Sequence, residues 1–234
     1  GGLLSGALVG TAGNRVVIEE FLTGEEVSFI SLCDGKNAVA LLPTQDHKAV
    51  FDGDRGPNTG GMGAYCDSRI LDEPMTRRIM DTIVRPTVDC MAAEGAPFTG
   101  FLYAGLMMTA GGPKVLEFNV RLGDPETQPI MLRMQGDFAA VLAGEAAPAW
   151  TADPSVCVVL AAAGYPGKPR VGDVISGIEE AEAAGATVFQ AGTRMGASGL
   201  ETSGGRVLGI TAPGATLQQA IAKAYAAAGH VHFE

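Results

Sequence analysis

Glu117-Phe118-Asn119-Val120-Arg121-Leu122-Gly123-Asp124-Pro125-Glu126 is the stretch that decides the fold and the chemistry of this 234-residue chain. An apolar run comes directly before it and predicts a β-strand. Because alternate residues of a strand share a face, Glu117, Asn119 and Arg121 are expected to point the same way, and the apolar residues between them into the core. A carboxylate, a carboxamide and a guanidinium on one face are the groups that holding Mg²⁺ and a triphosphate requires.

The same pattern also fits an ordinary exposed strand, on which a Glu–Arg pair contributes little stability. The Leu-Gly-Asp-Pro-Glu that follows adds a tight turn and two more acids, and this favours a binding site.

The composition is that of a globular chain with an acidic surface. Its residues are 47% apolar and only 18% charged, so the chain can bury a core and is not disordered. The net charge of −10 argues against nucleic acid as a partner but leaves room for a small anion held by local cations, metal and backbone N–H groups. No apolar stretch is long enough to span a membrane and no secretory leader is recognisable, so we expect a cytoplasmic protein without a membrane partner.

The cysteines and histidines give no metal or disulfide pattern. His230 and His232 lack a third ligand nearby, which favours a strand end over a zinc site. Reduced thiols are expected at the scattered Cys33, Cys66, Cys90 and Cys157.

The chain opens on Gly1-Gly2 without an initiator Met and closes inside an apolar alternation, so we expect a fragment.

Hydrophobic periodicity predicts an α+β chain. Residues 34–37 are expected to form a hairpin turn, and Pro43–Tyr65 a long glycine-rich loop of the kind that is usually functional. Strands are expected at Arg15–Phe21, Val27–Cys33, Ala38–Leu42, Phe101–Thr109 and Lys114–Val120.

A long helix is expected after Asp72, which would cap it, and Pro86 should kink it. Two shorter helices are expected at Thr127–Gln135 and Asp137–Ala143.

A domain boundary is predicted in Gly144–Pro154, which divides the chain into residues 1–147 and 148–234. The second unit is expected to be small and β-rich, with strands at Val156–Ala163, Ala186–Gln190 and Arg206–Thr211 and a helix at Thr216–Ala228.

Two further segments could bind ligands. In Val17–Glu26, a strand end could bond a planar base through its backbone, and a carboxylate past the turn could accept from ribose hydroxyls. In Gln45–Gly63, glycines let the backbone approach a ligand, while Asp46 and Lys48 could pair with an amino group and an anion. The alternatives are a solvated acidic turn and a mobile loop.

Together these segments resemble the phosphoribosylamine–glycine ligase family of the ATP-grasp superfamily. The resemblance rests above all on Gly-Pro-Asn-Thr-Gly-Gly-Met-Gly-Ala-Tyr at 56–65 and Glu-Phe-Asn-Val-Arg-Leu-Gly-Asp-Pro-Glu-Thr-Gln at 117–128. It implies the C-terminal part of an ATP-grasp domain up to residue 147, followed by the family's C-terminal domain, truncated at its end. The implied reaction joins glycine to phosphoribosylamine through a glycyl phosphate, at the expense of ATP, in de novo purine synthesis.

The resemblance also implies residue roles. Glu117 and Asn119 would bind Mg²⁺ or Mn²⁺, and Arg121 would face the transferred phosphoryl group. ATP would lie against Glu19, Glu20, Leu22 and Glu26, the last at the ribose. Glycine and phosphoribosylamine would lie against Asp46, Lys48, Asn58, Gly60, Gly61, Gly63 and Asp124. The protein is expected to be a monomer.

The chain departs from the wider superfamily in two respects. Tyr103-Ala104-Gly105-Leu106 has no acid where many ATP-grasp enzymes carry a further metal ligand, which agrees with this family. The family's N-terminal domain and its flap, whose lysines hold the phosphates, have no counterpart here, so we expect the isolated chain to be inactive. Another ATP-grasp carboxylate–amine ligase and a non-catalytic nucleotide-binding fragment are the alternatives.

Overall fold

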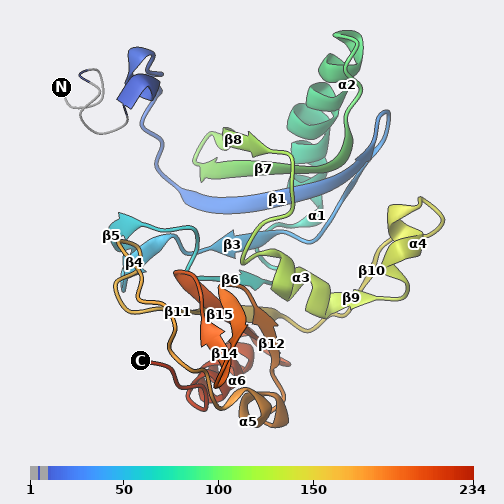
Figure 1. The fold of residues 1–234 in the computed structure, drawn as a ribbon. Coiled ribbons are helices and arrows are strands. Elements are labelled where there is room, and N and C mark those ends of the chain that lie inside the picture. Colours follow the sequence, from blue (N-terminus) through green and yellow to red (C-terminus); the bar gives the residue numbers. More distant parts are fainter. Residues whose placement is uncertain (1–4, 6–9) are drawn as a thin grey trace.

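The computed structural model describes residue 5 and residues 10–234, and a nine-stranded antiparallel sheet runs through them (Figure 1). The strand order is β12-β15-β11-β6-β3-β1-β7-β8, and β2 also pairs with β1. The α+β class with a mostly antiparallel sheet is therefore confirmed.

One end of the sheet is built from two hairpins and a long helix. The strands are β1 (Glu25–Asp34), β2 (Ala38–Ala40), β7 (Thr99–Thr109) and β8 (Gly112–Asn119). They confirm the strands predicted between residues 27 and 119, and the turn at Asp34–Asn37 as well. Val27, Phe29 and Ala104 point from this sheet into a core shared with the helix. Because side chains alternate along a strand, the residues between these in β1 and β7 point to the opposite face of the sheet.

The long helix has three parts: α1 (Glu73–Ile79), a π-helical turn η2 (Met80–Val84) and α2 (Arg85–Ala93). Asp72 caps it as predicted, because its carboxylate accepts a hydrogen bond from the Met75 amide. The kink expected at Pro86 stays a prediction; what the structure has directly before Arg85 and Pro86 is a π-helical turn, and proline has no N–H to continue the regular pattern.

The predicted loop Pro43–Tyr65 is only partly a loop. It contains β3 (Thr44–Asp46), β4 (Ala49–Phe51), β5 (Arg55–Asn58) and the first part of β6 (Gly63–Cys66). β3 and β6 lie inside the main sheet, where β3 pairs with β1 and with β6. The glycine-rich composition of this segment does not predict that pairing.

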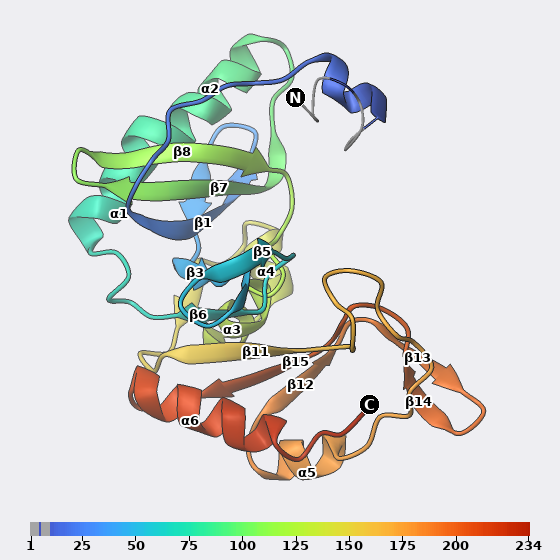
Figure 2. The same ribbon diagram turned by 90° about the vertical axis from the view of Figure 1, so that its left-hand side faces the viewer.

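The other end of the sheet lies between helices, as Figure 2 shows. β11 (Ser155–Ala161) and β15 (Arg206–Pro213) contact α6 (Leu217–Ala228) on one side and α3 (Thr127–Arg133) on the other. β12 (Thr187–Gln190) completes the edge. These three strands and α6 confirm the elements predicted beyond residue 155.

Several small elements complete the chain. The predicted helix at 127–135 ends at Arg133, and α4 (Phe138–Leu142) follows with Asp137 as its cap. The remaining elements that periodicity does not predict are η1 (Gly10–Asn14), β9 (Met134–Gln135), β10 (Ala149–Trp150), α5 (Ile178–Ala183), β13 (Thr193–Gly196) and β14 (Gly199–Thr202).

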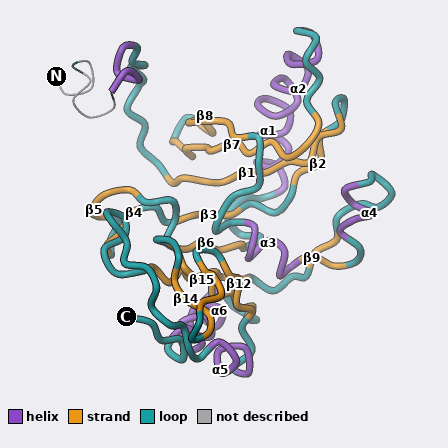
Figure 3. The backbone as a smooth tube through the Cα atoms, viewed as in Figure 1, coloured by secondary structure: helices purple, strands orange, loops and turns teal. Residues whose placement is uncertain are grey.

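Two further sequence predictions are wrong. Arg15–Phe21 forms no strand and runs as loop toward β1 (Figure 3), with Ile18 92% exposed and therefore no apolar packing to hold it. Phe118 and Val120 do not point into the core, since they are 43% and 72% exposed. β8 is an edge strand that ends at Asn119, so nothing among the described residues covers this side fully.

The sheet continues across the predicted boundary at 147/148, because β6 pairs with β11. The division into two domains therefore stays a prediction. Among the described residues, no helix is long and apolar enough to cross a membrane.

Candidate functional site

Glu117 and Asn119 come together on the sheet face opposite the long helix. Their strand partners are Gly105 and Tyr103, and the Asn119 side-chain amide donates a hydrogen bond to the Glu117 carboxylate at 3.1 Å. Gly105 has no side chain, and a Cβ there would lie 3.3 Å from Cγ of Glu117. Arg121 does not join them: it lies beyond the end of β8 and donates to the Leu122 carbonyl.

This donor set fits an open Mg²⁺ or Mn²⁺ site. It offers one carboxylate and one amide oxygen, and the glycine opposite Glu117 leaves room for the exposed Glu117 side chain. In the described part of the chain, no three His, Cys, Asp or Glu side chains gather closely enough to enclose a metal ion. A hard cation that takes its remaining ligands from phosphate and water suits such a pair, whereas a closed structural metal does not.

A lysine lies among acids on the neighbouring strands. Lys48 Nζ is 2.9 Å from Oε2 of Glu26 and 4.0 Å from Oδ1 of Asp46, whose side chain is only 6% exposed. Burial by itself lowers the pKa of Lys48, but the Glu26 hydrogen bond and the charges of Asp46 and Glu117 outweigh it, and the pKa is raised. Burial, aided by the charge of Glu126, raises the pKa of Asp46 to about 6.

A buried hydrogen-bond network connects β1 and β7 to Glu126. The Tyr103 hydroxyl donates to Oε1 of Glu126 at 2.8 Å and lies 2.7 Å from the Ser28 hydroxyl, which also reaches Glu126. Burial and the charge of Glu126 raise the pKa of Tyr103. Ser28 and Tyr103 are not among the residues predicted from the sequence, although each is a polar residue in an apolar strand, which is the signal that could have identified them.

The glycine-rich loop Asn58–Gly63 is held by backbone bonds to the segment that carries Asp46 and Lys48. The Thr59 amide donates to the Lys48 carbonyl at 2.7 Å, and the Met62 amide donates to the His47 carbonyl at 2.7 Å. At Gly61, φ is +112° and a Cβ would lie 2.5 Å from Cδ of Pro125. The structure therefore brings the predicted loop residues next to Asp46, Lys48 and Asp124.

The predicted adenine-side residues lie in the loop before β1. Glu20 pairs with Lys114 of β8 at 2.6 Å, which ties this loop to the strand that carries Glu117. Glu19 is exposed and Leu22 is half-buried. The roles of Glu19, Glu20 and Leu22 at the adenine stay predictions.

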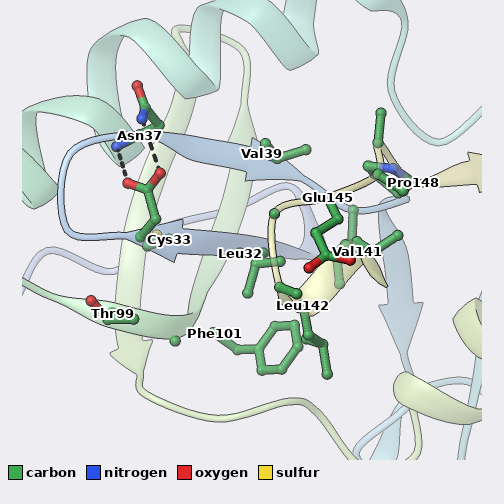
Figure 4. A pocket seen from close by; sticks show the side chains of 17 residues that line it. Leu32, Cys33, Asn37, Val39, Thr99, Phe101, Val141, Leu142, Glu145 and Pro148 are labelled. Atoms are coloured by element: carbon green, nitrogen blue, oxygen red, sulfur yellow. Dashed lines mark hydrogen bonds between the residues drawn. The ribbon is translucent and has the colours of Figure 1, made fainter. Parts of the chain in front are cut away.

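Several hollows lie along this sheet, and two of them differ in character. One of about 470 Å³ is lined by Glu26, Asp46, Lys48 and Asn58 and so belongs to the candidate site. A larger one of about 820 Å³ lies between the β1–β2 hairpin, the start of β7 and α4 (Figure 4). Its walls are largely apolar, with Leu32, Phe101 and Leu142 among them, and it contains none of the predicted site residues. Of these two hollows, only the smaller one contains predicted site residues.

The match of residues 2–127 to a family model of an ATP-grasp domain places the chain among the ATP-grasp proteins. N5-carboxyaminoimidazole ribonucleotide synthetase from Thermotoga maritima shares the fold at a TM-score of 0.58 and 17% identity, over 95% of this chain and 57% of that one. Two family models narrow the class. Residues 2–127 match "Phosphoribosylglycinamide synthetase, ATP-grasp (A) domain", and residues 155–234 match its C domain. The chain belongs to the phosphoribosylglycinamide synthetase family.

Its relatives carry the corresponding enzyme name. The phosphoribosylamine–glycine ligase of Yersinia pestis is 52% identical over 241 residues, which cover 99% of this chain and 56% of the relative. The crystal structure of phosphoribosylamine–glycine ligase from Thermotoga maritima has a TM-score of 0.89 and 39% identity, over 100% of this chain and 59% of that one. The chain thus spans little more than half the length of the relatives it matches.

Proposed function

We propose that this chain carries the metal-binding and acceptor-binding part of an ATP-dependent ligase that joins glycine to phosphoribosylamine, giving glycinamide ribonucleotide for purine synthesis. The observation that carries the proposal is the Glu117–Asn119 pair on one face of the sheet, in a chain 52% identical to a ligase of that name. The same proposal makes the protein a cytoplasmic monomer with small-molecule substrates.

The Glu117–Asn119 pair supplies two oxygens for Mg²⁺ or Mn²⁺ on an open face. The bound cation would neutralise charge on the phosphate oxygens of ATP. Arg121 lies two residues further along and uses only one guanidinium nitrogen in bonding the Leu122 carbonyl. Its remaining donors are available to a phosphoryl group, which a guanidinium recognises well.

The ATP base and ribose would lie along the entry to β1. The backbone of Glu20, with Glu19 and Leu22, would bond the adenine. Glu26 already accepts from Lys48 through Oε2, and its other oxygen can accept from ribose hydroxyls.

The binding site for glycine and phosphoribosylamine would be formed by Asp46, Lys48 and the glycine-rich loop. Lys48 provides positive charge for the glycine carboxylate or a phosphate, and the Asp46 carboxylate can accept hydrogen bonds from an ammonium group. Asn58, Gly60, Gly61 and Gly63, with Asp124, would position phosphoribosylamine. The chain's contribution to catalysis is alignment: it holds the carboxylate near the phosphoryl group and then near the amine that attacks the acyl phosphate.

The test is ADP release, assayed for the chain alone and for the chain joined to the part of the Yersinia pestis relative that it does not cover. We expect turnover in the joined protein only, and only with both glycine and phosphoribosylamine present. Equal release with another amino acid would point to a different ATP-grasp ligase. The chain alone should bind Mg·ATP only weakly in calorimetric titration. A joined protein that binds ATP without turnover would leave a non-catalytic nucleotide-binding module.

A further inference from the structure

Arg206, at the start of β15, joins two segments that lie far from it in the sequence. Its Nη1 donates to the carbonyls of Gly60 at 2.8 Å and Asp124 at 2.6 Å, and more weakly to the Gly61 carbonyl at 3.4 Å. Its Nη2 donates to the Asp124 carboxylate at 3.1 Å. One guanidinium therefore fixes the glycine-rich loop to the Asp124–Pro125 turn.

The local backbone explains how Arg206 reaches this position. The pairing of β11 with β15 runs in register up to Leu160 and Leu208 and then shifts, so that Ala161 faces Arg206. Such shifts redirect a side chain at the end of a strand. The backbone of Arg206 is itself anchored, because its carbonyl accepts from the Gly192 amide at 2.9 Å.

Tyr165 holds the same loop from a second side. Its hydroxyl accepts a hydrogen bond from the Gly60 amide at 3.0 Å, so that both backbone groups of Gly60 are bonded by side chains. The Tyr165 ring lies on Gly205, where a Cβ would come within 2.2 Å of it. A Cβ on Gly60 would lie 3.2 Å from the Arg206 guanidinium. The glycines at these positions allow this close contact.

We propose that Arg206 and Tyr165 are positioning residues that set the shape of the Gly60–Gly63 loop before any substrate binds to it. The inference rests on the proposed function for the identity of that substrate, a phosphorylated ribosyl amine with its glycine partner. The two residues act through the loop: Arg206 is 23% exposed in its side chain and directs its donors at backbone carbonyls and Asp124. The guanidinium bonds the carbonyls through Nη1 and the Asp124 carboxylate through Nη2, whereas a lysine ammonium has only one nitrogen to offer.

The first experiment uses hydrogen exchange on the chain as it is. Arg206→Ala should speed exchange in peptides covering residues 58–63 by at least about tenfold, since bonds to a charged group are lost. Tyr165→Phe should affect the Gly60 amide most, and Arg206→Lys should restore protection only partly. Arg194→Ala is the matched control: Arg194 pairs with Glu201 at 3.5 Å on the exposed β13–β14 hairpin. Unchanged exchange in the loop of Arg206→Ala would overturn the inference.

The second experiment separates positioning from a merely structural role. In the joined protein that tests the proposed function, Arg206→Ala should raise KM for phosphoribosylamine or glycine by about tenfold or more, with KM for ATP unchanged. Arg206→Lys should recover part of the loss. Equal losses against all three substrates would overturn the positioning role. An inactive wild-type joined protein would count against the proposed function, and the exchange experiment would then decide the inference by itself.

Discussion

The candidate site has two halves that are stabilised in opposite ways. The acidic face, formed by Glu26, Asp46, Lys48, Glu117 and Asn119, brings like charges together and leaves Glu117 exposed, with Asn119 as its hydrogen-bond partner. The loop junction, formed by Gly60, Gly61, Asp124, Tyr165 and Arg206, is closed by hydrogen bonds between distant segments.

This difference separates chemistry from architecture. The acidic face has the groups that a metal and a nucleotide need, and those groups contribute little to holding the chain together. The loop junction has few groups free for a ligand, yet it determines where a ligand could lie. Substitutions in the acidic face should therefore lower activity, and substitutions in the loop junction should disturb the structure.

The largest expected effect comes from Glu117→Gln. In the joined protein, loss of this carboxylate should lower the rate of ADP release by about 10²- to 10³-fold, because charge stabilisation of the phosphoryl oxygens is removed. The thermal midpoint should stay within about 2 °C, since Glu117 is exposed and glutamine can still accept from Asn119.

Glu145→Gln is the matched control for this substitution. Glu145 is an exposed glutamate on the wall of the apolar hollow, away from the acidic face. Normal turnover in Glu117→Gln, or an equal loss in Glu145→Gln, would remove Glu117 as a metal ligand.

The second effect tests the loop junction and uses Gly61→Ala. Gly61 has φ of +112°, and an added Cβ would lie 2.5 Å from the Pro125 ring, so both backbone strain and a clash oppose alanine. We expect the free energy of unfolding to fall by about 3 kcal/mol. Urea unfolding followed by circular dichroism measures it.

Gly95→Ala provides the comparison, since Gly95 also has a positive φ, +79°, but an added Cβ would meet nothing within 4 Å. It should cost only about 1 kcal/mol, the strain of the left-handed backbone alone. Equal losses at the two glycines would mean that contact with the Asp124–Pro125 turn contributes nothing.

The two halves also differ in how far the sequence could predict them. The acidic face follows from local rules: alternation in a strand places Glu117 beside Asn119, and the structure agrees. The same rule fails for Arg121, because β8 ends at Asn119 and alternation ends with it. It also fails for Phe118, because the rule cannot tell that β8 lies at an edge.

The loop junction could not be predicted from local patterns. Arg206 binds backbone carbonyls of residues 146 and 82 positions away, and every residue has such a carbonyl. Tyr165 accepts a hydrogen bond from a backbone amide, that of Gly60, and no sequence pattern singles out such a partner. Glu126 lies within the decisive motif, but its partners Ser28 and Tyr103 come from two other strands. Pairings of this kind require the fold.

The smallest effect should be a gain, and it tests whether the acidic face costs stability. The Asp46 carboxyl is buried and its pKa rises from 3.8 to about 6, so the folded protein holds a proton that the unfolded chain releases. Stability from this group is therefore present below pH 3.8 and is lost as the pH rises through 6. Asp46→Asn removes that loss and should stabilise the protein at pH 7 by roughly 2 kcal/mol.

Urea unfolding between pH 4 and pH 8 measures the gain, which should shrink toward zero at the acid end as Asp46 takes up its proton in the wild type. Asp89→Asn, which removes an equal charge from the exposed surface of α2, controls for the change in net charge. Destabilisation by Asp46→Asn at pH 7 would show instead that the ion pair with Lys48 outweighs the burial of Asp46. The acidic face would then stabilise the fold as the loop junction does, and the contrast between the two halves would fail.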